Sequence, residues 1–358
     1  MSVASTQTNN AISVDVTVGK PPAPLLWDDY VRAHNEGSIF HLSGWGQAVQ
    51  SAYKYNALYL TAQQGGRIVG VLPLVDIKSP LLGRSLISMP FSVGGGPLAD
   101  DDCALKALIS EAVSIGAKAG VKYLECRSNF VGGRDWIAKT GIYAGFKTIL
   151  PSSEDDHLNA IPRKRRAEIR KAIAAEQKGA LTIRHDGGAD EFYALYARSL
   201  RQLGTPIFPK RFLDSLIDAF PNDIEITIVN FDGAPVAALL SFCFGDALLP
   251  YYVGASPAAR RARAYDFIYW SVMRRAAAHG RRTFDFGRSR IDSGSYLYKK
   301  LWGVEPTPLT YQVKLIAAAE IANVNPNNPK FALFAKLWPL LPLAATKALG
   351  PLLAPNFP

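Results

Sequence analysis

The chain has 358 residues, of which 48% are hydrophobic, 20% are charged and 11% are aromatic. This apolar content excludes a disordered chain, and 29 glycines and 24 prolines without a triplet repeat exclude a collagen-like one. The length favours two domains over one compact core. The 40 basic and 30 acidic side chains give a formal net charge of +10. This charge favours an anionic partner, whether nucleic acid, a phosphorylated donor or a membrane surface.

The N-terminal segment and the cysteines bear on localisation. Residues 1–20 have neither the basic start nor the apolar core of a secretion signal, so we expect a disordered N-terminus on a cytoplasmic protein. The cysteines Cys103, Cys126 and Cys243 have no CxxC spacing and favour neither a disulfide framework nor a zinc site. No apolar run reaches the roughly 18 residues of a membrane-spanning helix, which leaves peripheral contact with the inner membrane as an alternative.

The first domain is expected at residues 21–155. Alternating apolar and β-branched residues predict strands, and apolar residues at helical spacing predict one helix. The predicted elements are strands at 57–63, 68–77 and 86–91, a helix at 103–119 and a strand at 121–127.

The second domain, expected at residues 181–318, repeats this plan. Its predicted elements are strands at 224–230, 235–244 and 248–253, a helix at 264–278 and a strand at 283–286. An acidic residue, Glu125 or Asp285, stands five positions after the glycine that ends each helix, and an Arg-Ser pair follows each. We therefore predict an internal duplication. The alternative is a chance similarity between two α+β halves.

A basic helix is predicted within a linker at residues 156–180. Proline at its first turn and glycine after its last turn mark its ends. Arg163, Arg166 and Arg170 share one face, which suits phosphate groups of nucleic acid or of a pyrophosphate donor. The alternative is a solvated linker helix without a ligand.

The C-terminal tail, residues 319–358, is apolar and interrupted by prolines. Tryptophan and lysine border its apolar runs, as in an interfacial anchor, so residues 330–358 are a candidate membrane-binding segment. Packing of the tail on the second domain is the favoured alternative.

The usual catalytic signatures are missing from the sequence. It contains no GxSxG elbow, no HExxH and no Walker loop, and its five histidines show no metal-ligand spacing, so we expect neither a metal nor a tightly bound cofactor. The densest group of unusual residues lies at 284–303. There Asp285 can accept a proton or orient an amine, and Arg288 can bind a carboxylate or phosphate. A structural ion pair between these two residues is the alternative.

The Phe-Asp-Phe-Gly-Arg-Ser and Tyr-Lys-Lys-Leu-Trp-Gly sequences in this region resemble FemAB-type acyltransferases, in particular those associated with exosortase and exopolysaccharide systems. Leu-Gly-Thr-Pro at 203–206 and Gly-Val-Leu-Pro-Leu at 70–74 support the resemblance, which covers about residues 25 to 315. It implies an α+β protein with two tandem GNAT-like folds, each a mixed curved sheet with flanking helices. It also implies transfer of an acyl or aminoacyl group to an amine.

The donor that this resemblance implies is acyl-CoA or aminoacyl-tRNA, with tRNA the less favoured. The glycine turn with which GNAT domains hold a pyrophosphate is absent, but Arg260, Arg261 and Arg263 offer cations in the second half. In the first half, three aspartates at 100–102 precede the helix and would repel a phosphate. Charge therefore favours a donor site in the second half.

Together these residues predict an N-acyltransferase acting on an amine-bearing cell-envelope or exopolysaccharide precursor. Asp285 is the candidate base, Tyr298 the proton donor to the leaving group, and Lys299 a further catalytic residue. The candidate substrate-binding residues are Arg288, Ser289, Lys300, Trp302, Thr205, Arg201, Tyr252, Glu125 and Arg127. The rival interpretations are a non-catalytic GNAT-fold scaffold of a polysaccharide or membrane system and, more weakly, an RNA-binding protein.

Overall fold

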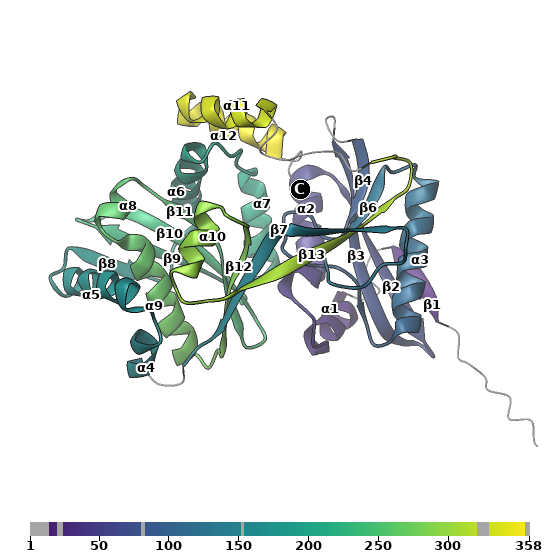
Figure 1. Cartoon of the computed structure of the whole chain (residues 1–358), viewed down its shortest axis with the longest axis horizontal. Helices are drawn as coiled ribbons and strands as arrows, with labels where there is room; N and C mark the ends of the chain where they lie inside the picture. Colours follow the sequence, from purple (N-terminus) through teal and green to yellow (C-terminus); the bar gives the residue numbers. More distant parts are fainter. Residues whose placement is uncertain (1–13, 20–23, 80–82, 152–153, 321–328, 355–358) are drawn as a thin grey trace, which may run out of the picture.

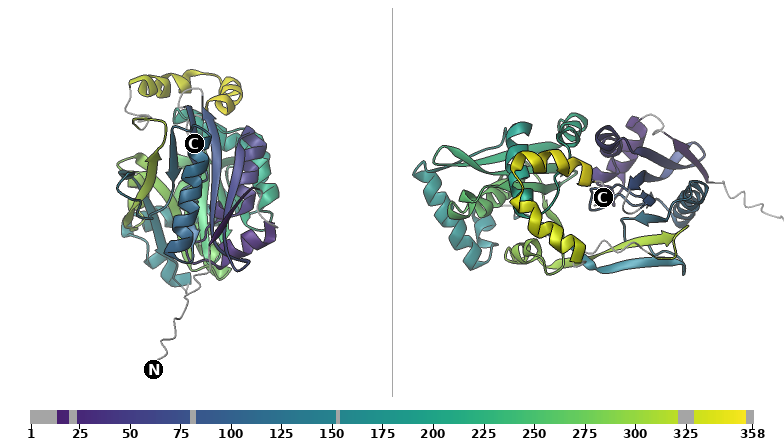
Figure 2. Two further views of the ribbon diagram at one scale, coloured as in Figure 1. Left: turned by 90° about the vertical axis from the view of Figure 1, so that its right-hand side faces the viewer. Right: turned by 90° about the horizontal axis from the view of Figure 1, so that it is seen from above.

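The architecture is that of a computed structural model, which describes residues 14–19, 24–79, 83–151, 154–320 and 329–354. Figure 1 shows two halves side by side, each a set of strands with helices around them. The chain builds the first half, then the second, and ends in a short helical tail at one end of the molecule (Figures 1 and 2).

The first half contains the predicted hairpin, the helix and the strand near 121–127. The strand predicted at 86–91 is wrong in its bounds: it covers Gly83–Ile87, because Met89 and Phe91 adopt left-handed φ values of 44° and 62° that end the extended conformation. Its elements are β1 (Asp15–Gly19), α1 (Pro24–Ala33), η1 (Ile39–His41), α2 (Ser43–Tyr53), β2 (Asn56–Gln64), β3 (Arg67–Ser79), β4 (Gly83–Ile87), β5 (Leu98–Ala99), α3 (Asp102–Lys118) and β6 (Tyr123–Cys126). Strands β1 to β4 pair antiparallel in sequence order, and β5 pairs antiparallel with β3. Strand β6 pairs parallel with β4, because α3 carries the chain back across the sheet.

The N-terminal segment differs in part from the expected disorder. Residues Asp15–Gly19 form β1, which pairs antiparallel with the edge strand β2. β-Branched residues at Val16, Thr17 and Val18 favour this extended pairing. Residues 1–13 and residue 20 lie outside the described residues.

The second half repeats the order of strands and helix. Its elements are β8 (Leu181–Arg184), α6 (Ala189–Gln202), α7 (Lys210–Ala219), β9 (Ile224–Phe231), β10 (Ala234–Phe244), β11 (Ala247–Ala255), α8 (Ala258–Arg261), α9 (Ala264–Ala278), β12 (Thr283–Arg290) and α10 (Gly294–Lys300). Strands β8 to β11 pair antiparallel, and β12 returns parallel to β11 after α9. This order matches β2, β3, β4, α3 and β6, as the predicted duplication requires.

Two long strands join the halves. They are β7 (Trp136–Ile149), which follows β6, and β13 (Pro306–Leu315), which follows β12. Strand β13 pairs with β6 and β7, while β7 pairs with β13 and β12. The sheet therefore runs β1-β2-β3-β4-β6-β13-β7-β12-β11-β10-β9-β8. Each half receives its last strand from the other, and Figure 1 shows this pair crossing between them.

One hydrophobic core also spans both halves. The Trp45 ring of α2 lies 5.5 Å from the Phe242 ring of β10, and the Phe40 ring lies 5.3 Å from the Tyr251 ring of β11. These aromatic rings belong to a single cluster of buried side chains. Because strands and core are both shared, the two halves hold a fixed geometry at their junction.

The linker and the tail complete the chain with α4 (Glu154–Asn159), α5 (Arg163–Gln177), α11 (Pro329–Leu337), η2 (Trp338–Leu340) and α12 (Leu343–Leu353). Helix α5 packs on α9 through the buried Ile169 and Ala172. The tail packs on α6. Within the described ranges, no helix is long and apolar enough to cross a membrane.

Candidate functional site

The candidate site residues lie mainly around two cavities of about 690 Å³ each. We call the first the α9 cavity, because α9 begins beside it. Its lining residues are Arg165, Glu168, Val253, Ala259, Arg260, Arg263, Tyr265, Asp266, Tyr269, Gly294, Ser295, Tyr298 and Lys299. We call the second the α3 cavity. Among its lining residues are Glu36, His41, Gly94, Gly95, Gly96, Asp100, Asp101, Asp102, Arg127, Ser128, Lys147, Asp285 and Tyr311.

Helix α9 begins without a side-chain cap. Its N-cap residue, Arg263, has a left-handed φ of 55°, and among the described side chains none caps the first turn. Arginine thus adopts the conformation for which glycine is usual, at a cost of about 1 kcal/mol. Arg260 and Arg263 both line the cavity beside this turn. Uncapped backbone amides and two guanidinium groups at a helix N-terminus suit a phosphate.

Helix α3, the counterpart of α9 in the first half, begins differently. The carboxylate of Asp101 caps it by accepting a hydrogen bond of 2.8 Å from the Ala104 amide. Asp100 and Asp102 add negative charge beside it, although Arg67 lies 3.4 Å from Asp100. An occupied helix N-terminus among carboxylates repels an anion and attracts a cation.

Strands β11 and β12 separate between residues that line different cavities. Within the described chain, these parallel strands are paired at only two positions, Ala247 with Thr283 and Leu248 with Phe284. Beyond them β11 continues to Val253, which lines the α9 cavity, while β12 continues to Asp285, which lines the α3 cavity.

Lys299 is buried between α10 and β12, with 7% of its surface exposed. Its ammonium group donates to the carbonyl oxygens of Gly287 and Arg288, at 3.2 and 2.9 Å. Burial lowers the pKa of Lys299 to about 8, and Arg288 adds to this shift while Asp285 opposes it. Its electrostatic coupling to Asp285 links the α9 cavity to the α3 cavity.

Tyr298 forms part of a polar group at the α9 cavity. Its hydroxyl donates a hydrogen bond of 3.0 Å to the carboxylate of Asp266, which also pairs with Arg165. The guanidinium carbon of Arg165 lies 4.9 Å from the centre of the Tyr298 ring. Burial and the Asp266 charge raise the pKa of Tyr298 well above its usual value, so its hydroxyl stays protonated.

Asp285 stands at a β-bulge opposite β7. The amide of Gly287, which has a φ of 68°, donates to its carboxylate at 2.8 Å. Burial raises the pKa of Asp285 against the opposing effects of this hydrogen bond, Lys147 and Lys299. Arg288 contacts other groups: it donates to the Tyr311 hydroxyl at 2.8 Å.

Glu125 and Arg127 form a buried pair in the first half. The Arg127 Nε atom lies 3.1 Å from one carboxylate oxygen, and the Lys139 ammonium lies 2.7 Å from the other. Arg127 also donates to the carbonyls of Met89 and Ser92 and lines the α3 cavity. Glu125 lies on β6, as Asp285 lies on the equivalent strand β12.

Arg201 and Thr205 lie near the tail. The Arg201 guanidinium donates to the carbonyls of Leu341 and Pro339, at 2.6 and 2.8 Å, so it holds the tail on α6. Thr205 is exposed just beyond the end of α6.

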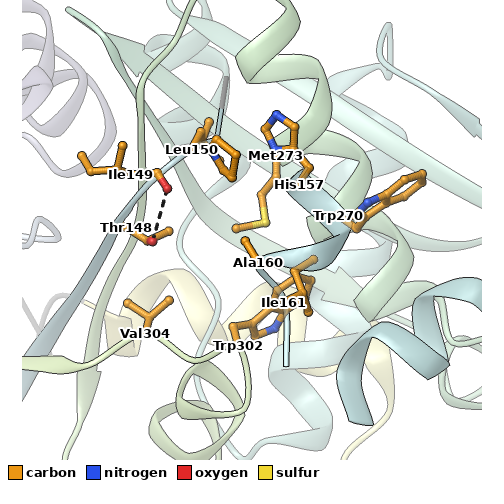
Figure 3. A pocket seen from close by; sticks show the side chains of 11 residues that line it. Thr148, Ile149, Leu150, His157, Ala160, Ile161, Trp270, Met273, Trp302 and Val304 are labelled. Carbon is orange, nitrogen blue, oxygen red and sulfur yellow. Dashed lines mark hydrogen bonds between the residues drawn. The ribbon is translucent and has the colours of Figure 1, made fainter. Parts of the chain in front are cut away.

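Three further candidates pack in the interior. The Tyr252 ring lies against Tyr196 and Phe208. The Ser289 hydroxyl is buried and has no hydrogen-bond partner among the described residues. Trp302 borders a small apolar pocket of about 40 Å³, where Figure 3 shows it with Ile161 and Val304.

Two predicted cations are exposed outside the α9 cavity lining. The Arg261 guanidinium carbon lies 5.6 Å from the centre of the Phe231 ring, and the Lys300 ammonium lies 5.9 Å from that of Tyr296. Arg261 is therefore a useful comparison for its neighbours Arg260 and Arg263.

Sequence reasoning missed Arg165, Asp266 and Tyr311. Arg165 lies off the basic face that the spacing of α5 singled out, yet it enters the α9 cavity. Its position one turn before the buried Ile169 was a usable signal, because residues four apart share a helix face. Among the described residues, no group of three or more His, Cys, Asp or Glu side chains could hold a metal ion.

Comparison with known proteins supports the fold. Residues 163–300 match the sequence model of the family described as "Acetyltransferase (GNAT) domain". This range runs from α5 to α10 and contains every residue that lines the α9 cavity. No curated protein matches the sequence.

Solved structures cover both halves. FemX is similar to this chain with a TM-score of 0.67 at 16% identity, covering 85% of this chain and 98% of that one. L-PGS from Bacillus licheniformis has a TM-score of 0.53 at 13% identity, covering 92% and 99%. A tandem GNAT protein from the clavulanic acid biosynthesis pathway has a TM-score of 0.52 at 12% identity, covering 86% and 100%. The predicted tandem GNAT-like fold is confirmed.

Proposed function

We propose that this protein, which carries a GNAT acetyltransferase domain, is an N-acyltransferase that binds its donor in the α9 cavity and its amine acceptor in the α3 cavity. The observation that carries the proposal is the difference between the two equivalent helix starts. The α9 start is uncapped and flanked by arginines, whereas the α3 start is capped and flanked by aspartates.

The donor assignment follows from charge and backbone geometry. Arg165, Arg260, Arg263 and Lys299 outnumber the two carboxylates of the α9 cavity, Glu168 and Asp266. The start of α9 adds backbone amides that a phosphate oxygen can accept from. A phosphate-bearing donor therefore gains more there than in the α3 cavity.

The acceptor assignment follows from the opposite charge balance. The α3 cavity has carboxylates at Glu36, Asp100, Asp101, Asp102 and Asp285, against the cations Arg127 and Lys147. An amine arrives in water as an ammonium ion, which these carboxylates attract. Asp285 is the carboxylate of this set that interacts electrostatically with Lys299 of the α9 cavity.

The transfer step uses three residues of this chain. The bound ammonium ion first releases one proton to water. The resulting amine nitrogen attacks the acyl carbonyl carbon, the bond from that carbon to the donor sulfur or oxygen breaks, and the nitrogen loses a second proton. Asp285, whose pKa is raised by burial, accepts that proton. Tyr298 donates a proton to the leaving atom, and Lys299 stabilises the negative charge on the carbonyl oxygen. Holding both substrates at the junction supplies much of the rate.

Acetyl-CoA is the donor to test first, because residues 163–300 match an acetyltransferase domain. Aminoacyl-tRNA is the other donor implied by the FemAB resemblance. The same resemblance supports a cell-envelope or exopolysaccharide precursor as the acceptor.

The test is calorimetric titration of the purified protein with acetyl-CoA and with bare CoA. We expect saturable binding of both, weakened about 10- to 100-fold in Arg260→Gln/Arg263→Gln, because each charge-assisted phosphate contact contributes about 1.5 kcal/mol. Arg261→Gln is the matched control and should bind as the wild type does. Asp285→Asn should retain binding but lose thiol release from acetyl-CoA with a panel of primary amines.

Two negative binding results would lead to different conclusions. Equal loss of binding in Arg261→Gln and the double variant would reject the α9 cavity as the donor site. Absence of acetyl-CoA and CoA binding, together with absence of a mobility shift of aminoacyl-tRNA, would reject the transferase and leave the scaffold interpretation.

A further inference from the structure

The tail formed by α11, η2 and α12 is anchored by its inner face. Trp338 and Thr346 are 3% exposed, and Ala354 is 8% exposed. A Cβ atom on Gly350 would lie 2.9 Å from backbone atoms of Ile207, so α12 closely contacts the segment after α6. Together with the Arg201 hydrogen bonds, these contacts hold the tail in one position. The expected packing on the second half is thus observed.

The outer face of the same tail is also apolar. Its leucines are exposed by 44 to 75%: Leu333, Leu337, Leu340, Leu349 and Leu352. They are five of the fifteen strongly exposed large apolar side chains found among the described residues. Leu333, Leu337 and Leu340 are spaced four and three residues apart, so they lie along one side of the tail. A surface helix in water normally places polar residues on that side.

The charge of the tail has one sign. Residues 329–354 contain Lys330, Lys336 and Lys347 and no aspartate or glutamate. Lys336 and Lys347 are exposed, and the Lys347 ammonium lies 5.6 Å from the centre of the Tyr193 ring on α6. Leucines flanked by cations alone match a surface with an apolar interior and anionic headgroups. Trp338, expected at such a surface, is buried instead and serves the inner face.

We propose that the outer leucines of the tail bind the surface of an anionic lipid bilayer while the inner face stays packed on α6. The leucines enter the boundary between headgroups and acyl chains, and the lysines pair with lipid phosphates. The tail lies at the top of the molecule in the left view of Figure 2 and in front of the rest in the right view, which is seen from above, so a flat surface can reach it. This proposal does not depend on the transferase assignment.

The test is flotation of the full chain with vesicles of equimolar phosphatidylcholine and phosphatidylglycerol, compared with phosphatidylcholine alone. We expect flotation with the anionic vesicles and at least a tenfold loss in Leu337→Ser/Leu340→Ser/Leu352→Ser and in Lys336→Glu/Lys347→Glu. Leu25→Ser/Leu26→Ser is the control for leucines, because these exposed residues of α1 lie far from the tail in Figure 1. Lys106→Glu/Lys118→Glu on α3 is the control for charge.

Three results would overturn the proposal. The wild type could remain with the soluble fraction, or the triple leucine variant could float as the wild type does. Analytical ultracentrifugation could also show an oligomer that the triple variant dissociates, which would assign the outer face to a second copy of the chain. The variants change exposed side chains, so circular dichroism should show each one folded.

Discussion

Replacing Glu125 with glutamine should destabilise the protein by several kcal/mol. Glu125 is 5% exposed and is the ion-pair partner of Arg127, which is 4% exposed. The substitution keeps the size of the side chain but removes the Glu125 carboxylate charge from beside the buried Arg127 guanidinium. Breaking a buried ion pair in this way costs about 3–5 kcal/mol.

The pKa of Glu125 gives a second value for the stability that this ion pair contributes. Burial alone would raise this pKa, but Arg127 and Lys139 outweigh it and lower the pKa from 4.5 to about 2. That difference corresponds to about 3 kcal/mol of stability. Because the pKa of Glu125 is lower in the folded protein than in the unfolded chain, the full stabilisation is present at pH values above 4.5. It is lost as the pH falls from 4.5 towards about 2.

The assay is urea unfolding followed by tryptophan fluorescence at two pH values. The variant should be about 3 kcal/mol less stable than the wild type near neutral pH. This difference in the free energy of unfolding should narrow by about 1 kcal/mol near pH 3.5, where the carboxylate of the unfolded wild-type chain is largely protonated while that of the folded chain is still ionised. Lys139→Met is the control. The Lys139 side chain is 24% exposed, so its removal should cost at most about 1 kcal/mol. This reasoning would be refuted if Glu125→Gln lowered the free energy of unfolding by less than about 1 kcal/mol, or if the difference from the wild type did not change with pH.

Two further changes test other parts of the structure. Lys299 has a pKa of about 8 when folded, so between this pH and the usual 10.5 the unfolded chain binds more protons. Between these pH values the free energy of unfolding of the wild type should therefore rise by up to about 1.4 kcal/mol per pH unit relative to that of Lys299→Met. The same pH dependence in both proteins would contradict the burial of the ammonium. Gly254→Ala places a Cβ atom 2.4 Å from the Tyr196 backbone and should cost about 3 kcal/mol in the same assay. Gly188→Ala, where a Cβ atom meets nothing within 4 Å, is its control. Equal stability of these two glycine variants would show that α6 does not pack this closely on β11.

Much of each half could be predicted because its signals are local. The alternation of apolar and polar residues identified the hairpin of β2 and β3. Apolar residues at helical spacing identified α3 and α9 within a residue of their observed ends. The repeated position of Glu125 and Asp285 located the equivalent strands. Arg260 and Arg263 were expected beside a phosphate from charge alone, and both line the α9 cavity.

Other features depend on residues far apart in the sequence. Strands β7 and β13 were not predicted, because their pairing partners belong to the other half and much of β7 is exposed. Tyr298 and Lys299 reach one cavity and Asp285 the other, although all three come from one short stretch of sequence. The β-bulge at Asp285 contributes to this separation, since it changes which side chains face each side of the sheet.

The sequence by itself determined the composition of each half, the duplication and the charge at each helix start, since these follow from residue type and short-range spacing. Only the tertiary structure decided that the halves exchange their last strands, that Arg201 binds the tail and that Lys299 and Asp285 line different cavities. These features require backbone hydrogen bonds and side-chain packing between residues up to about two hundred positions apart. Such contacts cannot be predicted from local patterns, because the sequence around each partner is typical of an ordinary strand, loop or surface residue and does not indicate its distant partner.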